Sequence, residues 1–425
     1  MPSLRTVTVP ADPYYKVRVS VEGLRPLAAG SIDDIISALT RPLTKVEAKP
    51  RPIVKETLEE TIKVTAESYT IASEKFNELF LKNQWADGLP IIPPTEEAVK
   101  WMLKGTTRSP TEIIGQVAPK NGMATIEKIA INAVMAGAKP EYLPVIIAAM
   151  EGFTDKDYNL THVQCSTGSF TPIIFVNGPI AKELNINSGI GFLGHGWRAN
   201  STIGRALRLC LLNLGHTWPQ VNDMATIGRQ SAYSFFTFAE NEAQSPWKPY
   251  HVDLGYKPKE STVTVSTGGS YFRPVAGGAV VTWTAKEVLQ ALAKTFASTA
   301  SPQLMNQKYI IVMAPELARE LAQLGFTKDT IKQWLHENAR IPYSEYRPSG
   351  IKELAEGIEA GRIPTHVLSK EQLKEGGVIP VVKGPEAIHI IVVGGIPGYT
   401  GVWNYGAPAH QTKKIHGATL TKAGH

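Results

Sequence analysis

Residues 387–398 read AIHIIVVGGIPG, an almost wholly apolar run followed by a glycine-rich loop. A short apolar run that is bounded by turn residues predicts a strand buried on both faces. Residues 308–313 predict a second strand of this kind, and residues 315–324 and 327–338 have the apolar spacing of helices. Because strands that alternate with helices indicate an α/β layer, this stretch decides the fold class of the C-terminal part of the chain.

Working outward, the whole chain predicts a mixed α/β (α+β) protein in three parts. Its 425 residues exceed the roughly 250–300 residues that one hydrophobic core usually supports. We expect an extended N-terminal arm and linker over residues 1–55, a larger α/β body with the site over 56–300, and a smaller C-terminal α/β unit with a basic tail over 301–425. The arm carries apolar side chains but is too short for a core of its own, so we expect an oligomer that buries it.

The expected body contains clear helix signals. Thr95 is followed by two glutamates, which predicts a capped helix that runs to about Leu103. Residues 125–136 and 142–151 predict two further helices, and residues 202–214 predict a fourth.

Composition excludes several classes of protein. With 43% hydrophobic and 19% charged residues, the chain is not disordered throughout. The net charge of +6 comes without a Lys/Arg cluster, so we expect no nucleic-acid partner, although an anionic substrate would be attracted. Two cysteines and no CxxC motif exclude a disulfide framework and a thiolate-rich metal site. No signal peptide or membrane-spanning stretch is evident, which predicts a cytoplasmic protein.

A glycine-rich segment, residues 193–200 (LGHGWRAN), is the first candidate site. It precedes the expected helix over 202–214, and the N-terminus of a helix attracts anions. The side chains that we expect to act there are His195 as a proton carrier and Arg198, Asn200 and Arg205 as substrate ligands. The alternative is a simple turn in which Arg198 pairs with an acidic side chain.

The segment from Phe238 to His251 is the second candidate site, because polar and aromatic loops often line sites. Its candidate residues are Glu240, Glu242 and His251 for acid–base catalysis or for a divalent ion, and Trp247 for substrate contact. The alternative is that the two glutamates form structural ion pairs. We predict that the segments 195–205 and 240–251 face one cavity.

Three further features are weaker candidates. Cys165 lies three residues after a histidine and could act as a nucleophile, although a lone cysteine is more often a small buried residue. Arg273 ends a glycine-containing turn over residues 267–273 that could hold an anion. The loop over residues 394–398 follows a buried strand, where ligands of α/β sheets gather, but it is not a GxGxxG motif.

A set of motifs resembles a large uncharacterised family. The motifs are Trp85–Thr95 (WADGLPIIPPT), Ala130–Gly137 (AINAVMAG), Val176–Pro179 (VNGP), Ile186–Gly189 (INSG), Arg198–Arg205 (RANSTIGR), Ala239–Glu242 (AENE) and Ser245–Trp247 (SPW). Members of that family are often encoded beside, or fused to, proteins with a Sec/Cys-Gly-Ser-Cys motif. Those UGSC-type proteins look distantly similar to the thiol- or selenol-bearing subunit of glycine reductase-like systems.

The resemblance implies a thiol- or selenol-bearing partner protein, because this chain contains no Cys-Gly-Ser-Cys. It carries over no catalytic residue. We therefore expect an enzyme subunit, of oxidoreductase or lyase type, that cleaves a carbon–heteroatom bond reductively or by elimination in a small anionic or polar organic molecule. The alternatives are a partner-independent hydrolase or lyase, with or without a metal, and a non-catalytic assembly subunit. The sequence indicates no particular cofactor or metal.

Overall fold

The computed structural model describes residues 7, 21–44, 47–48, 61–272, 284–299, 308–346, 348–396, 398–405 and 409–417. The predicted mixed α/β class is confirmed. The chain divides into two compact units, Met1–Val64 and Thr65–His425. None of the helices in the described ranges is long and apolar enough to cross a membrane.

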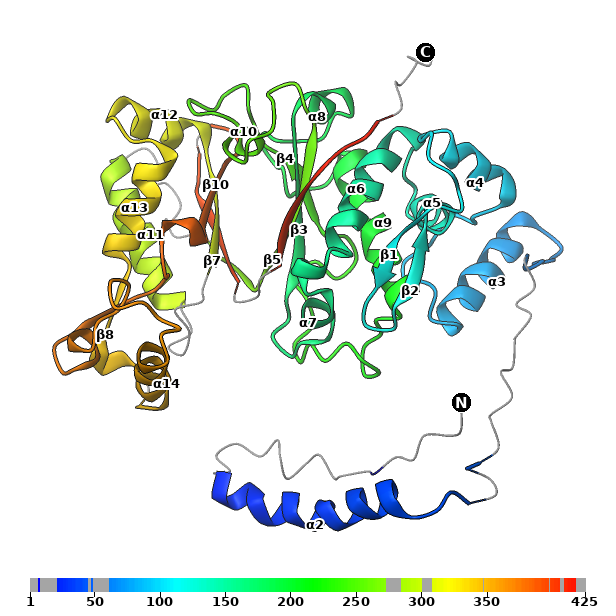
Figure 1. Ribbon diagram of the computed structural model, residues 1–425. Helices are drawn as coiled ribbons and strands as arrows, with labels where there is room; N and C mark the ends of the chain where they lie inside the picture. Colours follow the sequence, from blue (N-terminus) through cyan, green and yellow to red (C-terminus); the bar gives the residue numbers. More distant parts are fainter. Residues whose placement is uncertain are drawn as a thin grey trace. The chain divides into compact units, whose positions relative to one another are not determined.

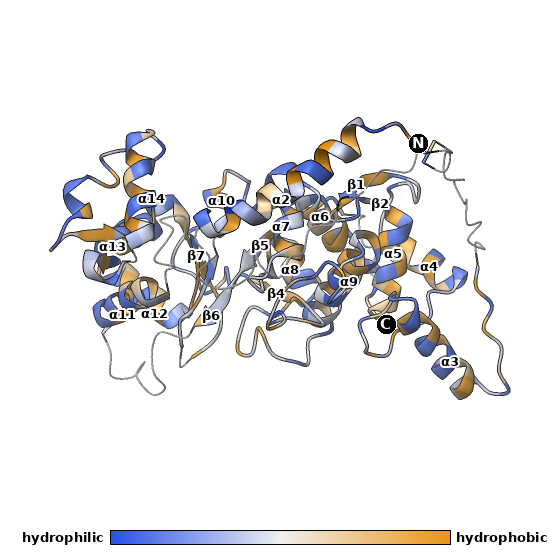
Figure 2. Ribbon diagram, turned by 90° about the horizontal axis from the view of Figure 1, so that it is seen from below, coloured by the Kyte–Doolittle hydropathy of each residue, from blue (hydrophilic) through white to orange (hydrophobic). Residues whose placement is uncertain are grey.

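The smaller unit contains one long helix, α2 (Val21–Thr40). Its exposed large apolar side chains are Ile32, Ile35, Ile36 and Leu39, with exposed fractions between 43% and 80%. Residues spaced by three and four positions lie on one face of a helix, so α2 presents an apolar stripe. Figure 2 shows the mixture of hydrophobic and hydrophilic residues along this helix.

The larger unit contains two four-stranded sheets among its described residues. The first has the order β12-β5-β3-β4, with β3 (Thr171–Asn177), β4 (Phe236–Ala239), β5 (Thr262–Gly268) and β12 (His410–Lys414). In this sheet β3 and β4 are parallel, and the other pairs are antiparallel.

The second sheet has the order β10-β7-β11-β6, with β6 (Ser270–Phe272), β7 (Lys308–Met313), β10 (Ile388–Val392) and β11 (Gly401–Tyr405). Here β7 and β10 are parallel. Two short hairpins complete the strands, β1 (Ile113–Val117) with β2 (Gly122–Thr125) and β8 (Arg340–Pro342) with β9 (Val378–Pro380). Each four-stranded sheet takes strands from both sides of residue 300.

Twelve described helices surround the sheets of the larger unit. They are α3 (Tyr69–Lys82), α4 (Glu96–Leu103), α5 (Ile126–Met135), α6 (Leu143–Phe153), α7 (Leu160–Cys165), α8 (Pro179–Glu183), α9 (Arg198–Gly215), α10 (Tyr250–Asp253), α11 (Ala285–Thr299), α12 (Pro315–Gln323), α13 (Lys328–Asn338) and α14 (Pro348–Glu359). The predicted cap at Thr95 is present, since its side chain accepts a hydrogen bond from the Ala98 N–H. The helix predicted over 202–214 begins four residues earlier, so Arg198 and Asn200 lie inside α9.

The sheets and helices of the larger unit form four layers, α/β/β/α (Figure 1). Helices α6 and α9 pack on the outer face of the first sheet, and α11, α12 and α13 pack outside the second. Alternate residues of β7 explain this arrangement. Ile311 belongs to the core beneath the helices, whereas Ile310 and Val312 belong to the core between the two sheets. The strand is apolar from Tyr309 to Met313 because this part is buried on both faces.

Candidate functional site

The parallel strand pairs of both sheets end at one place, which we call the carboxyl edge. The Glu240 N–H donates to the carbonyl of Val176 at the end of β3 (3.1 Å). The Asn241 N–H donates to the carbonyl of Val392 at the end of β10 (2.7 Å), and Gly394 N–H donates to the Ser188 carbonyl (2.8 Å). Ligands of α/β sheets gather where parallel strands end, so this edge is where a site is expected.

Glu240 is the central residue of the carboxyl edge. Its side chain is buried, and its Oε2 accepts hydrogen bonds from the Tyr250 N–H (2.7 Å) and the Asn177 Nδ2 (2.5 Å). Burial raises the pKa of Glu240 from its ordinary 4.5 to about 7, although the charge of Lys328 and both hydrogen bonds oppose that rise. A carboxyl group with this pKa both gives and takes protons near neutral pH.

Glu242 lies beside Glu240 and is partly exposed, with 27% of its side chain open to solvent. Its Oε1 accepts hydrogen bonds from Asn177 Nδ2 (3.0 Å) and from the Gly178 N–H (2.7 Å). Gly178 has a φ of +85°, and a Cβ there would meet the carbonyl oxygen of Glu260 at 2.2 Å. Only glycine therefore lets the chain turn here and point this N–H at the carboxylate.

Unsatisfied polar atoms concentrate at the carboxyl edge. Asn177 Oδ1, Glu240 Oε1 and both ring nitrogens of His251 are buried without a hydrogen-bond partner in the part of the chain that the structure describes. The nearest carboxylate atom to His251 is Glu242 Oε1, 3.7 Å from Nδ1. Buried polar groups are costly to leave unpaired. Their concentration marks a place with capacity for a polar occupant, either water or a ligand.

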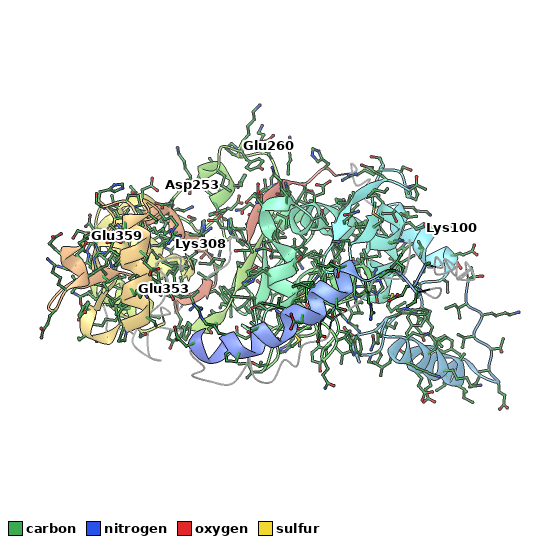
Figure 3. All side chains as sticks on the ribbon, turned by 60° about the horizontal axis from the view of Figure 1, so that its bottom comes forward. Lys100, Asp253, Glu260, Lys308, Glu353 and Glu359 are labelled. Carbon is green, nitrogen blue, oxygen red and sulfur yellow. The ribbon has the colours of Figure 1, made fainter. Side chains whose placement is uncertain are left out.

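Lys328 and Asp253 complete this cluster. Lys328 Nζ donates to the Lys248 carbonyl (2.7 Å) and to Asp253 Oδ2 (2.8 Å), and it lies 3.9 Å from Glu240 Oε1. Asp253, labelled in Figure 3, is the exposed end of α10. Sequence reasoning missed Lys328 because nothing at the start of α13 marks it as functional. Asn177 could have been found, because it directly follows a buried strand and precedes Gly-Pro.

A second buried charged cluster lies at the loop that follows α9. Arg229 pairs with Asp223 through two hydrogen bonds (3.0 and 2.7 Å). It also donates to the backbone carbonyls of Val163, Gln164 and Phe170. Burial raises the pKa of Asp223, but the hydrogen bonds and charge of Arg229 outweigh that effect and hold the pKa below its ordinary value. Arg229 thus ties the loop to the chain around α7 and the start of β3.

His195 lines a cavity of about 350 Å³, together with residues 192–194, 200–201 and 230–237. Asn200 holds the surrounding loops, since its side chain binds the Asn187 N–H (2.8 Å) and the Thr237 carbonyl (2.9 Å). Glu240, Glu242 and His251 do not line this cavity. This cavity thus takes residues from the segment 195–205 but not these three from the segment 240–251. That the two segments face one cavity stays a prediction.

The two candidate arginines of α9 differ in their surroundings. Arg205 donates to both carboxylate oxygens of Asp87 (2.9 and 3.0 Å) and to the carbonyls of Leu89 and Pro90. The structural ion pair considered for Arg198 is thus found at Arg205. Arg198 is exposed, and its Nε and Nη2 donate to the Gly137 carbonyl (3.1 and 2.9 Å).

The remaining candidates lie outside both clusters or outside the described residues. Burial raises the pKa of the Cys165 thiol, which disfavours the reactive thiolate. Trp247 donates through Nε1 to the Phe326 carbonyl (3.0 Å) and packs against the core of the second sheet. Arg273 lies outside the described residues.

Comparison with known proteins assigns neither a family nor a function to this chain. No protein-family model matches the chain, and no curated protein matches it. In the described residues there is also no group of three or more His, Cys, Asp or Glu side chains placed to hold a metal ion. The candidate site therefore rests on the geometry of the carboxyl edge.

Proposed function

We propose that this protein is an enzyme subunit in which Glu240 transfers protons to and from a small polar organic molecule at the carboxyl edge. The observation that carries the proposal is a buried carboxyl group with a pKa of about 7, one oxygen of which makes no hydrogen bond and has only Lys328 near it, at 3.9 Å. A general acid or base works best when its pKa lies near the working pH, and perturbed carboxyl groups concentrate in active sites. Oε1, which makes no hydrogen bond, is the atom that we assign to the substrate.

Glu242 supports the proposal as the solvent-accessible carboxylate beside Glu240. The same Asn177 amide nitrogen contacts both carboxylates, and Glu242 is the more exposed of the two. We assign His251 to the same site as a positioning residue, because its buried Nδ1 makes no hydrogen bond and lies 3.7 Å from Glu242 Oε1.

The reaction that we propose is reductive or eliminative cleavage of a carbon–heteroatom bond, with the thiols on a partner protein. In the reductive form, two thiols become a disulfide, the cleaved bond receives their electron pair, and the carbon and the heteroatom each take a proton. In the eliminative form, Glu240 removes a proton from the neighbouring carbon, and the heteroatom leaves with its bonding electrons. Neither cysteine of this chain suits the first role, because burial raises the pKa of both Cys165 and Cys210.

We also infer an oligomer, because the smaller unit taken by itself leaves the apolar stripe on α2 uncovered. A second copy of the chain would bury this stripe and stabilise the assembly by about 25 cal/mol per Å² of apolar area. Removing residues 1–55 should then lower the particle mass in light scattering. An unchanged mass would contradict the inferred oligomer.

The test of the proposed activity compares the full-length protein with Glu240→Gln. Both are incubated with a panel of small amines, thioethers and hydroxy acids, with and without dithiothreitol as a stand-in dithiol, and products are followed by NMR. We expect turnover by the wild type and a loss of about 10²–10⁴-fold in Glu240→Gln. Dependence on dithiothreitol identifies the reductive form.

The matched control is Glu260→Gln, which removes a carboxylate near the same edge that is paired with Lys414 instead. This variant should keep wild-type turnover. Equal turnover by Glu240→Gln and the wild type would overturn the role of Glu240. No turnover of any panel member by the wild type, with or without dithiol, would favour the assembly subunit.

A further inference from the structure

A second cavity, of about 390 Å³, surrounds the first turn of α9 and is separate from the carboxyl edge. Its lining residues are Lys139, Glu141, Tyr142, Glu183, Leu184, Asn185, Gly196, Trp197, Arg198 and Ala199. Neither Glu240 nor Glu242 lines it, so it is not part of the site proposed above.

The floor of this cavity is the uncapped N-terminus of an 18-residue helix. The first bond of α9 runs from the Ser201 N–H to the Trp197 carbonyl (3.1 Å), and the Trp197 side chain caps nothing. The N–H groups of Arg198 and Ala199 precede that bond and have no partner among the described residues. Together with the helix dipole, such groups favour a bound anion.

Tyr142 provides an independent sign of a ligand. Its side chain is only 6% exposed, it lines the cavity, and its hydroxyl makes no hydrogen bond to any described residue. Burial raises the pKa of Tyr142, the Glu141 charge adds to that rise, and the Arg198 charge opposes it, so both charged groups act on this hydroxyl. The tyrosine is thus buried except where it meets the cavity, and its hydroxyl has hydrogen-bonding capacity available to a molecule bound there.

Arg198 is held in position for the same role. Its Nε and Nη2 donate to the Gly137 carbonyl, which fixes the plane of the guanidinium group. Its Nη1 has no partner among the described residues, and its charge lies at the cavity. The Lys139 Nζ is 3.6 Å from Glu141 Oε1, so the second cation is already paired. Arg198 is thus the cation that is available to a ligand.

We propose that this cavity binds the oxyanion group, carboxylate or phosphate, of a small molecule through Arg198, the Tyr142 hydroxyl and the first N–H groups of α9. The ligand accepts hydrogen bonds from all three. Glu141 and Glu183 on the cavity wall disfavour ligands with more than one exposed negative group, because like charges repel. The site operates independently of proton transfer at Glu240.

The experiment titrates the full-length protein with sodium acetate and, separately, with inorganic phosphate, by NMR or calorimetry. Ionic strength is held constant with sodium chloride. We expect saturable binding of at least one of the two, and the tighter of them identifies the class of ligand. Arg198→Ala should weaken that binding at least tenfold, and Tyr142→Phe should weaken it about three- to tenfold.

Two controls keep the outcomes distinct. Lys182→Ala removes an exposed lysine of α8 outside the cavity and should bind like the wild type. Glu240→Gln should also bind like the wild type, so a failure of the proposed enzyme activity leaves this result standing. Absence of saturable binding, or wild-type affinity in Tyr142→Phe with an unchanged melting temperature, would overturn the proposed anion site.

Discussion

Two buried charged clusters of the larger unit differ in how many of their polar atoms have hydrogen-bond partners. Arg229 has a side chain that is 7% exposed, and it is matched by Asp223 and three backbone carbonyls. Glu240 is 3% exposed, yet one of its oxygens makes no hydrogen bond and its pKa is raised rather than lowered. The first cluster uses its charge to hold a loop, whereas the second keeps unused polar capacity. Burial is the same in the two clusters, whereas hydrogen-bond satisfaction differs, and that difference is why we propose the second cluster as the functional one.

The largest effect is expected when the satisfied cluster is broken. Arg229→Ala leaves the Asp223 carboxylate buried without its partner and removes the donor from three carbonyls. We expect a loss of about 3–5 kcal/mol in the free energy of unfolding, measured by denaturant titration. The control is Arg319→Ala on the exposed face of α12, which should change stability by less than about 0.5 kcal/mol. A loss below about 1 kcal/mol in Arg229→Ala would show that Arg229 does not hold the loop in place.

The cluster around Glu240 should make the free energy of unfolding depend on pH. Because the pKa of Glu240 rises from 4.5 to about 7 on folding, the folded state holds a proton that the unfolded state has released between those pH values. The contribution of Glu240 is fully present below about pH 4.5 and is lost as the pH rises through 7. The wild type should therefore lose about 3 kcal/mol of stability over this interval relative to Glu240→Gln.

The measurement is denaturant unfolding of both proteins at a series of pH values. Glu242→Gln serves as the comparison, because it removes a neighbouring carboxylate and keeps Glu240. It should retain most of the pH dependence. Parallel stability curves for the wild type and Glu240→Gln would show that Glu240 ionises in the folded state as it does in the unfolded chain.

The smallest effect is expected at Cys165, which lies near the satisfied cluster. Burial raises the pKa of its thiol, even though the Arg229 charge acts in the opposite direction. Cys165→Ala should therefore leave the turnover measured with dithiothreitol unchanged. Loss of turnover with an unchanged melting temperature would return Cys165 to the candidate catalytic residues and remove the need for a partner thiol.

The sequence predicted the local elements better than their assembly. Thr95 and the glutamates after it specify a helix start within one turn, and residues 387–393 specify a buried strand by hydrophobicity alone. The start of α9 was placed four residues late, because the glycine-rich segment before it reads as a turn. The pairing of β12 with β5 could not be predicted, since residues 410–414 are mostly polar and contact a distant strand.

The candidate site shows the same limit. Glu240, Glu242 and His251 were found because they crowd one short segment between a strand and an aromatic loop. Lys328 was not found, because it comes from a helix in another layer and only the tertiary structure places it 3.9 Å from Glu240. Arg198 and Arg205 lie about two helical turns apart. Only the folded chain shows that Asp87 forms an ion pair with Arg205.

Strand β12 also affects how the protein avoids aggregation. His410 and Ser266 meet across 144 positions, and closing so long a loop makes this pairing a slow step of folding. Without β12, β5, with the sequence TVTVSTG, would offer an unpaired edge rich in β-branched residues to other chains. Once docked, β12 presents a new edge that carries Lys413 and Lys414, which pair with Asp155 and Glu260. Charged residues on an edge strand discourage sheet-to-sheet association, so β12 both covers the edge of β5 and protects the finished sheet.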